Sequence, residues 1–160
     1  MEIIEAPSSQ SPISGNTLFL AGGITNCPDW QAEILTMLRG EVTIYNPRRK
    51  DFPIGDPAAA RLQIEWEYRR LAEADMILFW FARGSLNPIV LYELGMWGNA
   101  RWRKIFIGCD PEYQRDQDVR IQTELARPEV EVVTTLQELA DQVNGYLTRL
   151  EDPPLSGTKT

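Results

Sequence analysis

The chain has 160 residues, 43% of them hydrophobic, so it is long enough to bury one core and short enough to form a single domain. Its formal net charge of -7 argues against a nucleic acid polymer or an anionic membrane as partner, because both repel such a surface. The chain contains no histidine, which excludes Ser-His and Cys-His catalysis and histidine zinc sites. Proton chemistry must therefore use carboxylates, Tyr, Lys or Cys.

Both ends of the chain are rich in Ser and Pro and show no sustained hydrophobic period. We expect flexible tails at residues 1–16 and 151–160, with one domain at residues 17–150 between them. No apolar run approaches the roughly 20 residues that cross a bilayer, and the N-terminus does not resemble a signal peptide. We therefore expect a cytoplasmic protein with no membrane partner, whose Cys27 and Cys109 are ordinary reduced thiols.

Between the expected tails, short apolar runs alternate with longer amphipathic segments. In chain order they predict a strand at 18–21, a helix at 30–38, a strand at 42–45, a helix at 61–73, a strand at 76–81, a helix at 88–101, a strand at 104–108, a helix at 116–126, a strand at 130–133 and a helix at 136–150. The runs MILFWF and IFIG are apolar at consecutive positions, as is typical of parallel strands covered on both faces. We predict an α/β fold with a flavodoxin-like, doubly wound, parallel five-stranded sheet and helices on both faces.

In such a sheet, ligands bind beyond the carboxyl ends of the strands, near the point where strand order reverses. The informative loops are therefore residues 22–29, 46–60 and 82–87. The first loop opens with two glycines but lacks the GxGxxG pattern, and the second strand ends in YNPRR without a following acidic residue, so we expect no nicotinamide cofactor. In the second loop, Asn46, Arg48 and Arg49 are candidates for contacting a base or a phosphate. The alternative is that this Arg pair forms an ordinary solvated face.

Glu93 is the strongest candidate for chemistry. The sequence SLNPIVLYELGMW predicts a helix capped by Asn87 that begins at Pro88, which places Glu93 in its second turn. The neighbours three and four residues away are all hydrophobic: Ile89, Val90, Met96 and Trp97. Burying a carboxylate there costs several kcal/mol unless it is paired, and positions that tolerate this cost are often functional. The alternative is a buried structural acid.

A second carboxylate, Glu67, shares a face of the preceding helix with Gln63, Ile64 and Leu71. We expect this face to meet the sheet edge, whereas Glu65 and Glu73 are expected to be solvated or ion-paired. Two inward carboxylates on adjacent helices suit substitution at an anomeric carbon, where one attacks and the other assists the leaving group.

Four segments together, in this order and at these spacings, resemble a nucleoside 2-deoxyribosyltransferase: LFLAGGI, YNPRR, QIEWEYRRLAEADMILFWF and SLNPIVLYELGMW. The resemblance covers residues 17–108, and the ELG motif is its most specific part. It implies a retaining double displacement in which the glutamate of ELG, Glu93, attacks C1′. A covalent 2-deoxyribosyl enzyme forms, and an incoming base then takes the sugar.

The resemblance also assigns roles to other residues. Glu67 would handle the proton on the nucleobase, with glutamate where many members have aspartate. Asn87 stands six residues before Glu93, where many members place an aspartate that binds sugar hydroxyls. The expected substrate-binding residues are Phe19, Gly22, Gly23, Asn46, Arg48, Gln63 and Asn87. The implied partners are deoxynucleosides, free nucleobases and further copies of the chain in a homo-oligomer, with no cofactor and no metal.

Two other functions compete with this one. The first is a hydrolase of the same superfamily that passes the deoxyribosyl group to water, starting from a deoxynucleoside or its 5′-monophosphate. Arg48, Arg49 or Arg83 with Ser85 would then bind the phosphate, but the serine-rich loop expected before ELG is reduced to one serine. The second is a non-catalytic nucleotide-binding module, which would have no need for a buried nucleophile.

Overall fold

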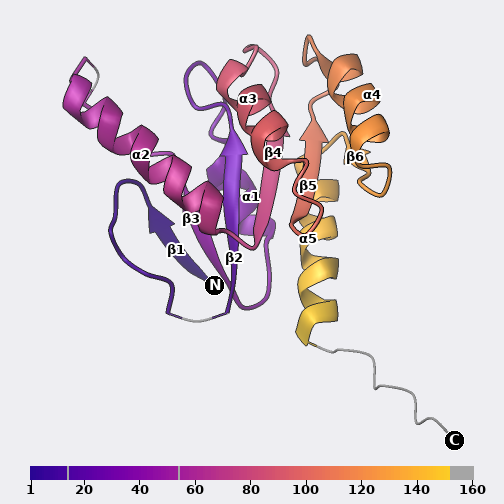
Figure 1. Ribbon diagram of the computed structural model, residues 1–160, viewed down its shortest axis with the longest axis horizontal. Coiled ribbons are helices and arrows are strands. Elements are labelled where there is room, and N and C mark those ends of the chain that lie inside the picture. Colours follow the sequence, from indigo (N-terminus) through magenta and orange to yellow (C-terminus); the bar gives the residue numbers. More distant parts are fainter. Residues whose placement is uncertain (14, 54, 152–160) are drawn as a thin grey trace, which may run out of the picture.

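A parallel β-sheet with helices on both faces forms the centre of the computed structural model, which describes residues 1–13, 15–53 and 55–151 (Figure 1). The strands are β1 (Glu2–Glu5), β2 (Asn16–Gly22), β3 (Val42–Asn46), β4 (Met76–Phe81), β5 (Lys104–Cys109) and β6 (Val132–Val133). The helices are α1 (Trp30–Met37), α2 (Pro57–Glu73), α3 (Pro88–Trp97), α4 (Asp116–Ala126) and α5 (Leu136–Glu151). The described residues thus confirm an α/β fold built on a parallel sheet.

The sheet has six strands in the order β1-β3-β2-β4-β5-β6, so the prediction of five strands was wrong. The additional strand, β1, lies in the segment for which we expected a flexible tail, and it pairs in parallel with β3 from Glu2↔Thr43 to Glu5↔Asn46. Only Ile4 of this strand is buried, so no hydrophobic period marks it in the sequence. The flavodoxin-like description therefore holds only approximately. At the other end of the chain, Glu151 closes α5, and the remainder of the expected C-terminal tail lies outside the described residues.

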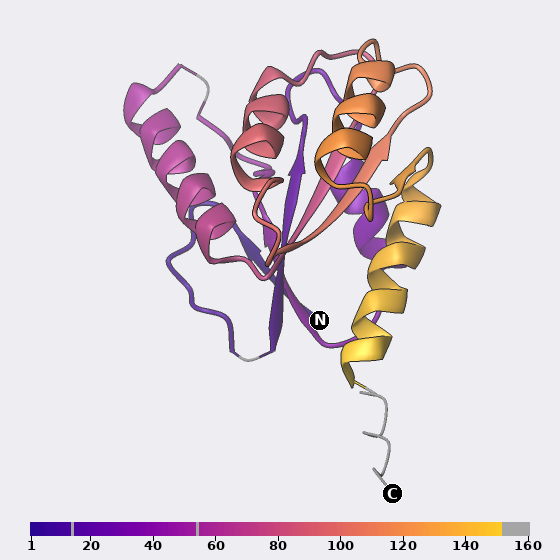
Figure 2. The ribbon, with the colours of Figure 1, turned by 45° about the vertical axis from the view of Figure 1, so that its right-hand side comes forward.

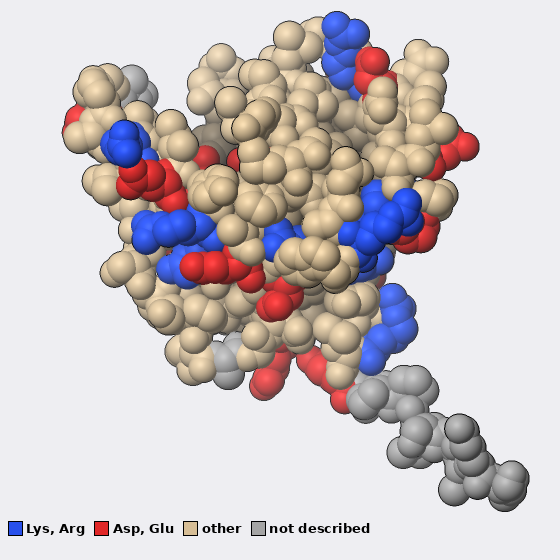
Figure 3. All heavy atoms as spheres, in the orientation of Figure 1, with Lys and Arg blue, Asp and Glu red and all other residues tan. Residues whose placement is uncertain are grey.

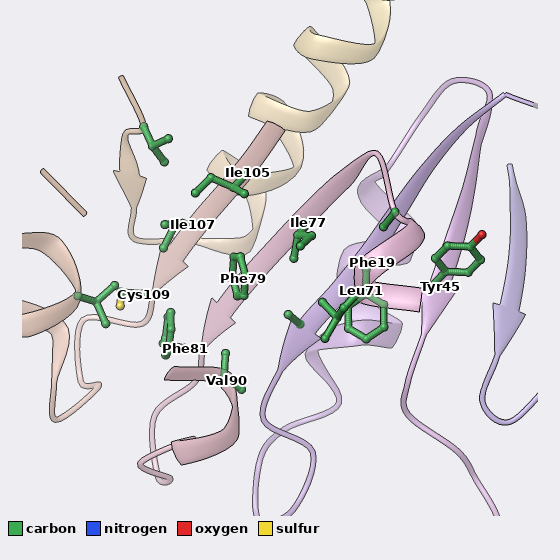
Figure 4. Close-up of a cluster of buried hydrophobic side chains, with 14 of the residues drawn as sticks. Phe19, Tyr45, Leu71, Ile77, Phe79, Phe81, Val90, Ile105, Ile107 and Cys109 are labelled. Carbon is green, nitrogen blue, oxygen red and sulfur yellow. The ribbon is translucent and has the colours of Figure 1, made fainter. Parts of the chain in front are cut away.

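Each face of the sheet packs against its own helices, because side chains alternate along every strand. Phe19 and Ala21 of β2 belong to a cluster that includes Trp66 of α2 and Val90 of α3. Figure 4 shows this cluster extending across the sheet from Tyr45 to Cys109. Leu18 and Leu20, which alternate with these residues along β2, belong to a second cluster with α1 and α5, and Figure 2 shows these two helices together on that side of the sheet.

Helix boundaries differ from the predicted ones where capping decides them. Helix α2 begins at Pro57, before the expected position 61, because the Asp56 side chain accepts a hydrogen bond from the Ala58 backbone N–H and Pro57 suits the first turn. Helix α3 ends at Trp97, before the expected position 101. None of the helices described is both long and apolar enough to cross a membrane.

Strand order reverses beside β2, since the chain passes from β2 to β3 on one side and then returns to β4 on the other. Helix α2 connects β3 to β4 across this point, helix α3 follows β4, and both helices lie on the same face of the sheet (Figure 1). This geometry brings the loops after β2, β3 and β4 to one edge, where a ligand site is expected.

Candidate functional site

A cavity of about 330 Å³ opens at this edge, a volume in the lower range of small-molecule sites. Its walls come from the end of β2 and the following loop, from Pro47, from Glu67 of α2, and from the loop and first turns of α3 that carry Ser85, Asn87 and Glu93. Figure 3 shows this face hollowed between α2 and α3, with acidic atoms visible in the hollow. The structure therefore brings both predicted catalytic carboxylates to one cavity.

The two carboxyl groups influence each other's ionisation. Burial raises the pKa of Glu93, and the charge of Glu67 raises it further, to about 8. Burial also raises the pKa of Glu67, although a hydrogen bond from Gln63 opposes this rise. Groups coupled in this way titrate as a pair. Such a pair loses its protons in two steps, and between these steps the cavity contains a carboxylate and a carboxylic acid at the same time.

Gly22 and Gly23 line the cavity, and close packing behind them demands the absence of side chains. A Cβ on Gly22 would lie 2.2 Å from Cζ2 of Trp30, and a Cβ on Gly23 would lie 1.9 Å from Oδ1 of Asn87. Both distances are far below van der Waals contact. The two glycines therefore let the loop after β2 pass directly over Trp30 and against Asn87.

Asn87 precedes α3, as predicted, but its side chain does not cap the helix. It adopts a left-handed conformation, with φ of 47°, and its amide Nδ2 donates hydrogen bonds to the carbonyl oxygens of Ala82 at 3.2 Å and Ser85 at 3.3 Å. Its Oδ1 accepts a hydrogen bond from Sγ of Cys27 at 3.5 Å. Since both amide hydrogens are used by the chain, Oδ1 is the polar atom that Asn87 can offer to a ligand.

Asn46 and Arg48 do not line the cavity. The Arg48 guanidinium donates to Oε1 of Gln31 at 2.9 Å and to the carbonyl oxygens of Ile24 and Pro28 at 3.2 and 3.0 Å. It also pairs with Asp29 at 3.3 Å. Arg48 thus holds the loop after β2, whose residue Ile24 forms part of the cavity wall. Asn46 is buried, and its Oδ1 accepts a hydrogen bond from the Arg48 backbone N–H at 3.1 Å.

Phe19 lines the cavity as predicted, whereas Gln63 is buried and contacts Glu67 rather than the cavity. The sequence did not single out several other lining residues: Ala21, Ile24, Thr25, Pro47, Pro88, Ile89 and Val90. Ile24, Thr25 and Pro47 belong to the loops chosen from the topology, whereas the others lie at the end of β2 or in the first turn of α3. No residue type marks them, because they are mainly small or apolar. Their place in the wall depends on where the loops converge.

The described residues that line the cavity include no Lys or Arg. Arg83, a candidate for phosphate binding, forms ion pairs with Asp110 at 2.9 Å and Glu112 at 3.0 Å. Nor does any group of three or more Cys, Asp or Glu within the described ranges meet the requirements of a metal site. The arrangement is therefore an acidic cavity suited to an uncharged or cationic ligand.

A sequence model of one protein family, described as "Nucleoside 2-deoxyribosyltransferase like", matches residues 15–113. The match spans β2 to β5 and includes every residue of the cavity wall. A search of curated proteins found no match. Because the family match covers more than half of the chain and contains the entire cavity, this protein belongs to the nucleoside 2-deoxyribosyltransferase-like family.

Proposed function

We propose that the protein is a nucleoside 2-deoxyribosyltransferase that exchanges the nucleobase of 2′-deoxynucleosides through a covalent deoxyribosyl-glutamate intermediate. The observation that carries this proposal is the convergence of Glu67 and Glu93 on one cavity with coupled ionisation. A retaining substitution at an anomeric carbon needs both members of such a pair, a carboxylate to attack and an acid to protonate the leaving group.

In the first half of the reaction, a carboxylate oxygen of Glu93 attacks C1′ of the bound deoxynucleoside. The C1′–N bond breaks, its electron pair goes to the base nitrogen, and the carboxyl group of Glu67 supplies a proton to the departing base. The products are the free nucleobase and a 2-deoxyribosyl ester of Glu93. Because the charge of Glu67 helps to raise the pKa of Glu93 to about 8, the resting pair carries its single proton on Glu93. This proton must move to Glu67 before Glu93 can attack and the base can leave.

In the second half, a nitrogen of an incoming base attacks C1′, and the ester bond to Glu93 breaks to restore its carboxylate. The carboxylate of Glu67 takes the proton that the incoming nitrogen loses. Each half inverts the anomeric carbon, so the new nucleoside keeps the original configuration. The net reaction exchanges one base for another and leaves the pair with its one proton.

The cavity wall supports an uncharged nucleoside as substrate. Phe19, Pro47 and Ile89 offer apolar surface to a base and a deoxyribose, and Oδ1 of Asn87 can accept a hydrogen bond from a sugar hydroxyl. The cavity has no cationic side chain among its described residues, which disfavours the 5′-monophosphate that the hydrolase alternative would use.

Cys27 and Cys109 are free thiols, as suits a reducing cytoplasm.

We also propose that a second copy of the chain covers the outer surface of α2 and α3. Five large hydrophobic side chains on these two helices are more than half exposed: Leu62, Ile64, Tyr68, Ile89 and Tyr92. An apolar surface of this kind, beside an open cavity, is typical of an interaction site. Light scattering should give a mass above that of one chain, and Tyr92→Lys should reduce it; a monomeric wild-type protein would contradict this assembly.

The proposed function is tested by chromatography of the purified protein incubated with deoxyinosine, with and without free adenine or cytosine. Transfer requires a new deoxynucleoside only in the presence of the added base. Release of hypoxanthine and free sugar without a new nucleoside would instead make the protein a hydrolase. No change with any deoxynucleoside or its monophosphate would favour the non-catalytic binding module.

A further inference from the structure

The side chain of Gln63 forms a bridge behind the cavity. It is buried, and its amide Nε2 donates two hydrogen bonds, one to the carbonyl oxygen of Pro47 at 2.7 Å and one to Oε1 of Glu67 at 2.7 Å. Both partners line the cavity, whereas Gln63 does not. Gln63 therefore connects the wall after β3 to the carboxyl group of α2.

The carbonyl group of Pro47 fixes the direction of this bridge. A backbone carbonyl oxygen only accepts hydrogen bonds, so it requires the nitrogen of the Gln63 amide on its side. The amide oxygen of Gln63 then points elsewhere, and this buried atom finds no hydrogen-bond partner in the described part of the chain. Leaving the buried Oε1 of Gln63 unpaired costs free energy, so the two hydrogen bonds of Nε2 must outweigh that cost.

The same contact decides where Glu67 can carry a proton. A hydrogen atom on Oε1 would face the N–H of Gln63, donor against donor, whereas a hydrogen atom on Oε2 leaves Oε1 free to accept. We propose that Gln63 is a positioning residue that acts through Glu67, holding its carboxyl group so that the proton exchanged with the nucleobase resides on Oε2. This inference rests on the role of Glu67 in the proposed function.

The arrangement also stabilises the carboxylate form of Glu67, because the Gln63 hydrogen bond opposes the rise in the pKa of Glu67 that burial causes. Loss of the bond should therefore leave Glu67 protonated at higher pH and free to rotate. Departure of the first base requires the acid form and capture of the second requires the carboxylate form. Gln63 is thus expected to affect the chemical steps more than substrate binding.

The first test is a carboxyl titration that needs no activity. Gln63→Met keeps the length of the side chain and removes its hydrogen-bonding groups, and Gln63→Leu serves if the first variant does not fold. The carboxyl ¹³C signal of Glu67, assigned by its loss in Glu67→Gln, should titrate at higher pH in the Gln63 variant than in the wild type. An unchanged pKa in a folded variant would overturn the proposal.

The second test is a double-mutant cycle on base exchange. Gln63→Met should lower kcat by about tenfold or more and change KM by less than about threefold. On the Glu67→Gln background, the same substitution should lower the residual kcat by less than about twofold, because its target is already gone. An equal loss on both backgrounds would show that Gln63 acts through the Pro47 loop and would refute the proposal. If the wild-type protein exchanges no base, the proposed function fails while the titration still decides the role of Gln63.

Discussion

Glu67 of α2 and Glu93 of α3 line the same cavity, and the charge of Glu67 adds to burial in raising the pKa of Glu93 to about 8. Neither carboxyl group can therefore be assigned a protonation state without the other. Between its two titration steps the pair holds one carboxylate and one carboxylic acid, which are the nucleophile and the acid that base exchange needs.

Glu93→Gln should lower base exchange by at least roughly 10⁴-fold, because it removes the nucleophile while keeping the shape of the side chain. The measurement is chromatography of the exchange products, with circular dichroism to show that the fold is intact. Glu65→Gln is the matched control, since Glu65 lies on the outer side of α2 in an exposed ion pair with Arg61. Exchange at the wild-type rate by Glu93→Gln would refute the nucleophile assignment.

The rate of exchange should depend on pH as a bell. Above pH about 8 the pair loses its single proton, so no acid remains for the leaving base. The acidic limb, where both groups become protonated, should lie above 4.5, because burial raises the pKa of both carboxyl groups from that value. In Glu67→Gln the pKa of Glu93 should fall below about 8, since the repelling charge is gone. A ¹³C titration that shows no change in the pKa of Glu93 would contradict the coupling.

The thermal stability of the protein should also depend on pH through the ionisation of Glu93. The pKa of Glu93 is raised in the folded protein, so its protonated form favours folding below pH 4.5, and this contribution is lost as pH rises through about 8. Relative to Glu93→Gln, the wild-type Tm should therefore fall between pH 5 and pH 9, on the order of 5 °C. Parallel Tm curves for the two proteins across this range, measured by calorimetry, would argue against a raised pKa of Glu93 in the folded protein.

Gly23→Ala should impair both folding and exchange, because the added Cβ would overlap Oδ1 of Asn87 and force that side chain to move. Overpacking of this kind typically costs about 1–3 kcal/mol of unfolding free energy. Gly95→Ala on α3 is the control, since its Cβ would meet nothing within 4 Å, and it should stabilise the helix slightly. Denaturant unfolding and exchange kinetics of both variants check the expectation, which fails if the two behave alike.

Arg48→Met should raise the KM for the nucleoside more than it lowers kcat. The variant loses the hydrogen bonds that hold the carbonyl groups of Ile24 and Pro28, so the loop in the cavity wall should loosen without a change at the carboxyl pair. Arg49→Met, whose parent side chain stacks on Phe52 at 5.5 Å, is the neighbouring control. A large fall in kcat with unchanged KM would instead favour a direct contact of Arg48 with the reacting base.

Much of the fold was accessible from the sequence because burial leaves a periodic trace within each element. Consecutive apolar residues predicted β4 and β5, and the alternation of short and long segments predicted the parallel sheet. The strand β1 was missed for the same reason, since it is an edge strand with one buried side chain, held by pairing with β3. A strand of that kind is stabilised by hydrogen bonds to a distant segment, which leave no local pattern.

The sequence likewise predicted one part of the candidate site and not another. The position of Glu93 in an apolar helix face was evident from the sequence, because that face is a property of one helix, and the topology then placed it at the carboxyl edge of the sheet. Only the tertiary structure decided the partners of the side chains. Asn87 does not cap α3, and Arg48 binds the loop after β2. Gln63 holds Glu67, whose charge acts on Glu93. Side-chain partners and coupled ionisation depend on atoms from separate elements meeting in space, and no period along the chain records that meeting.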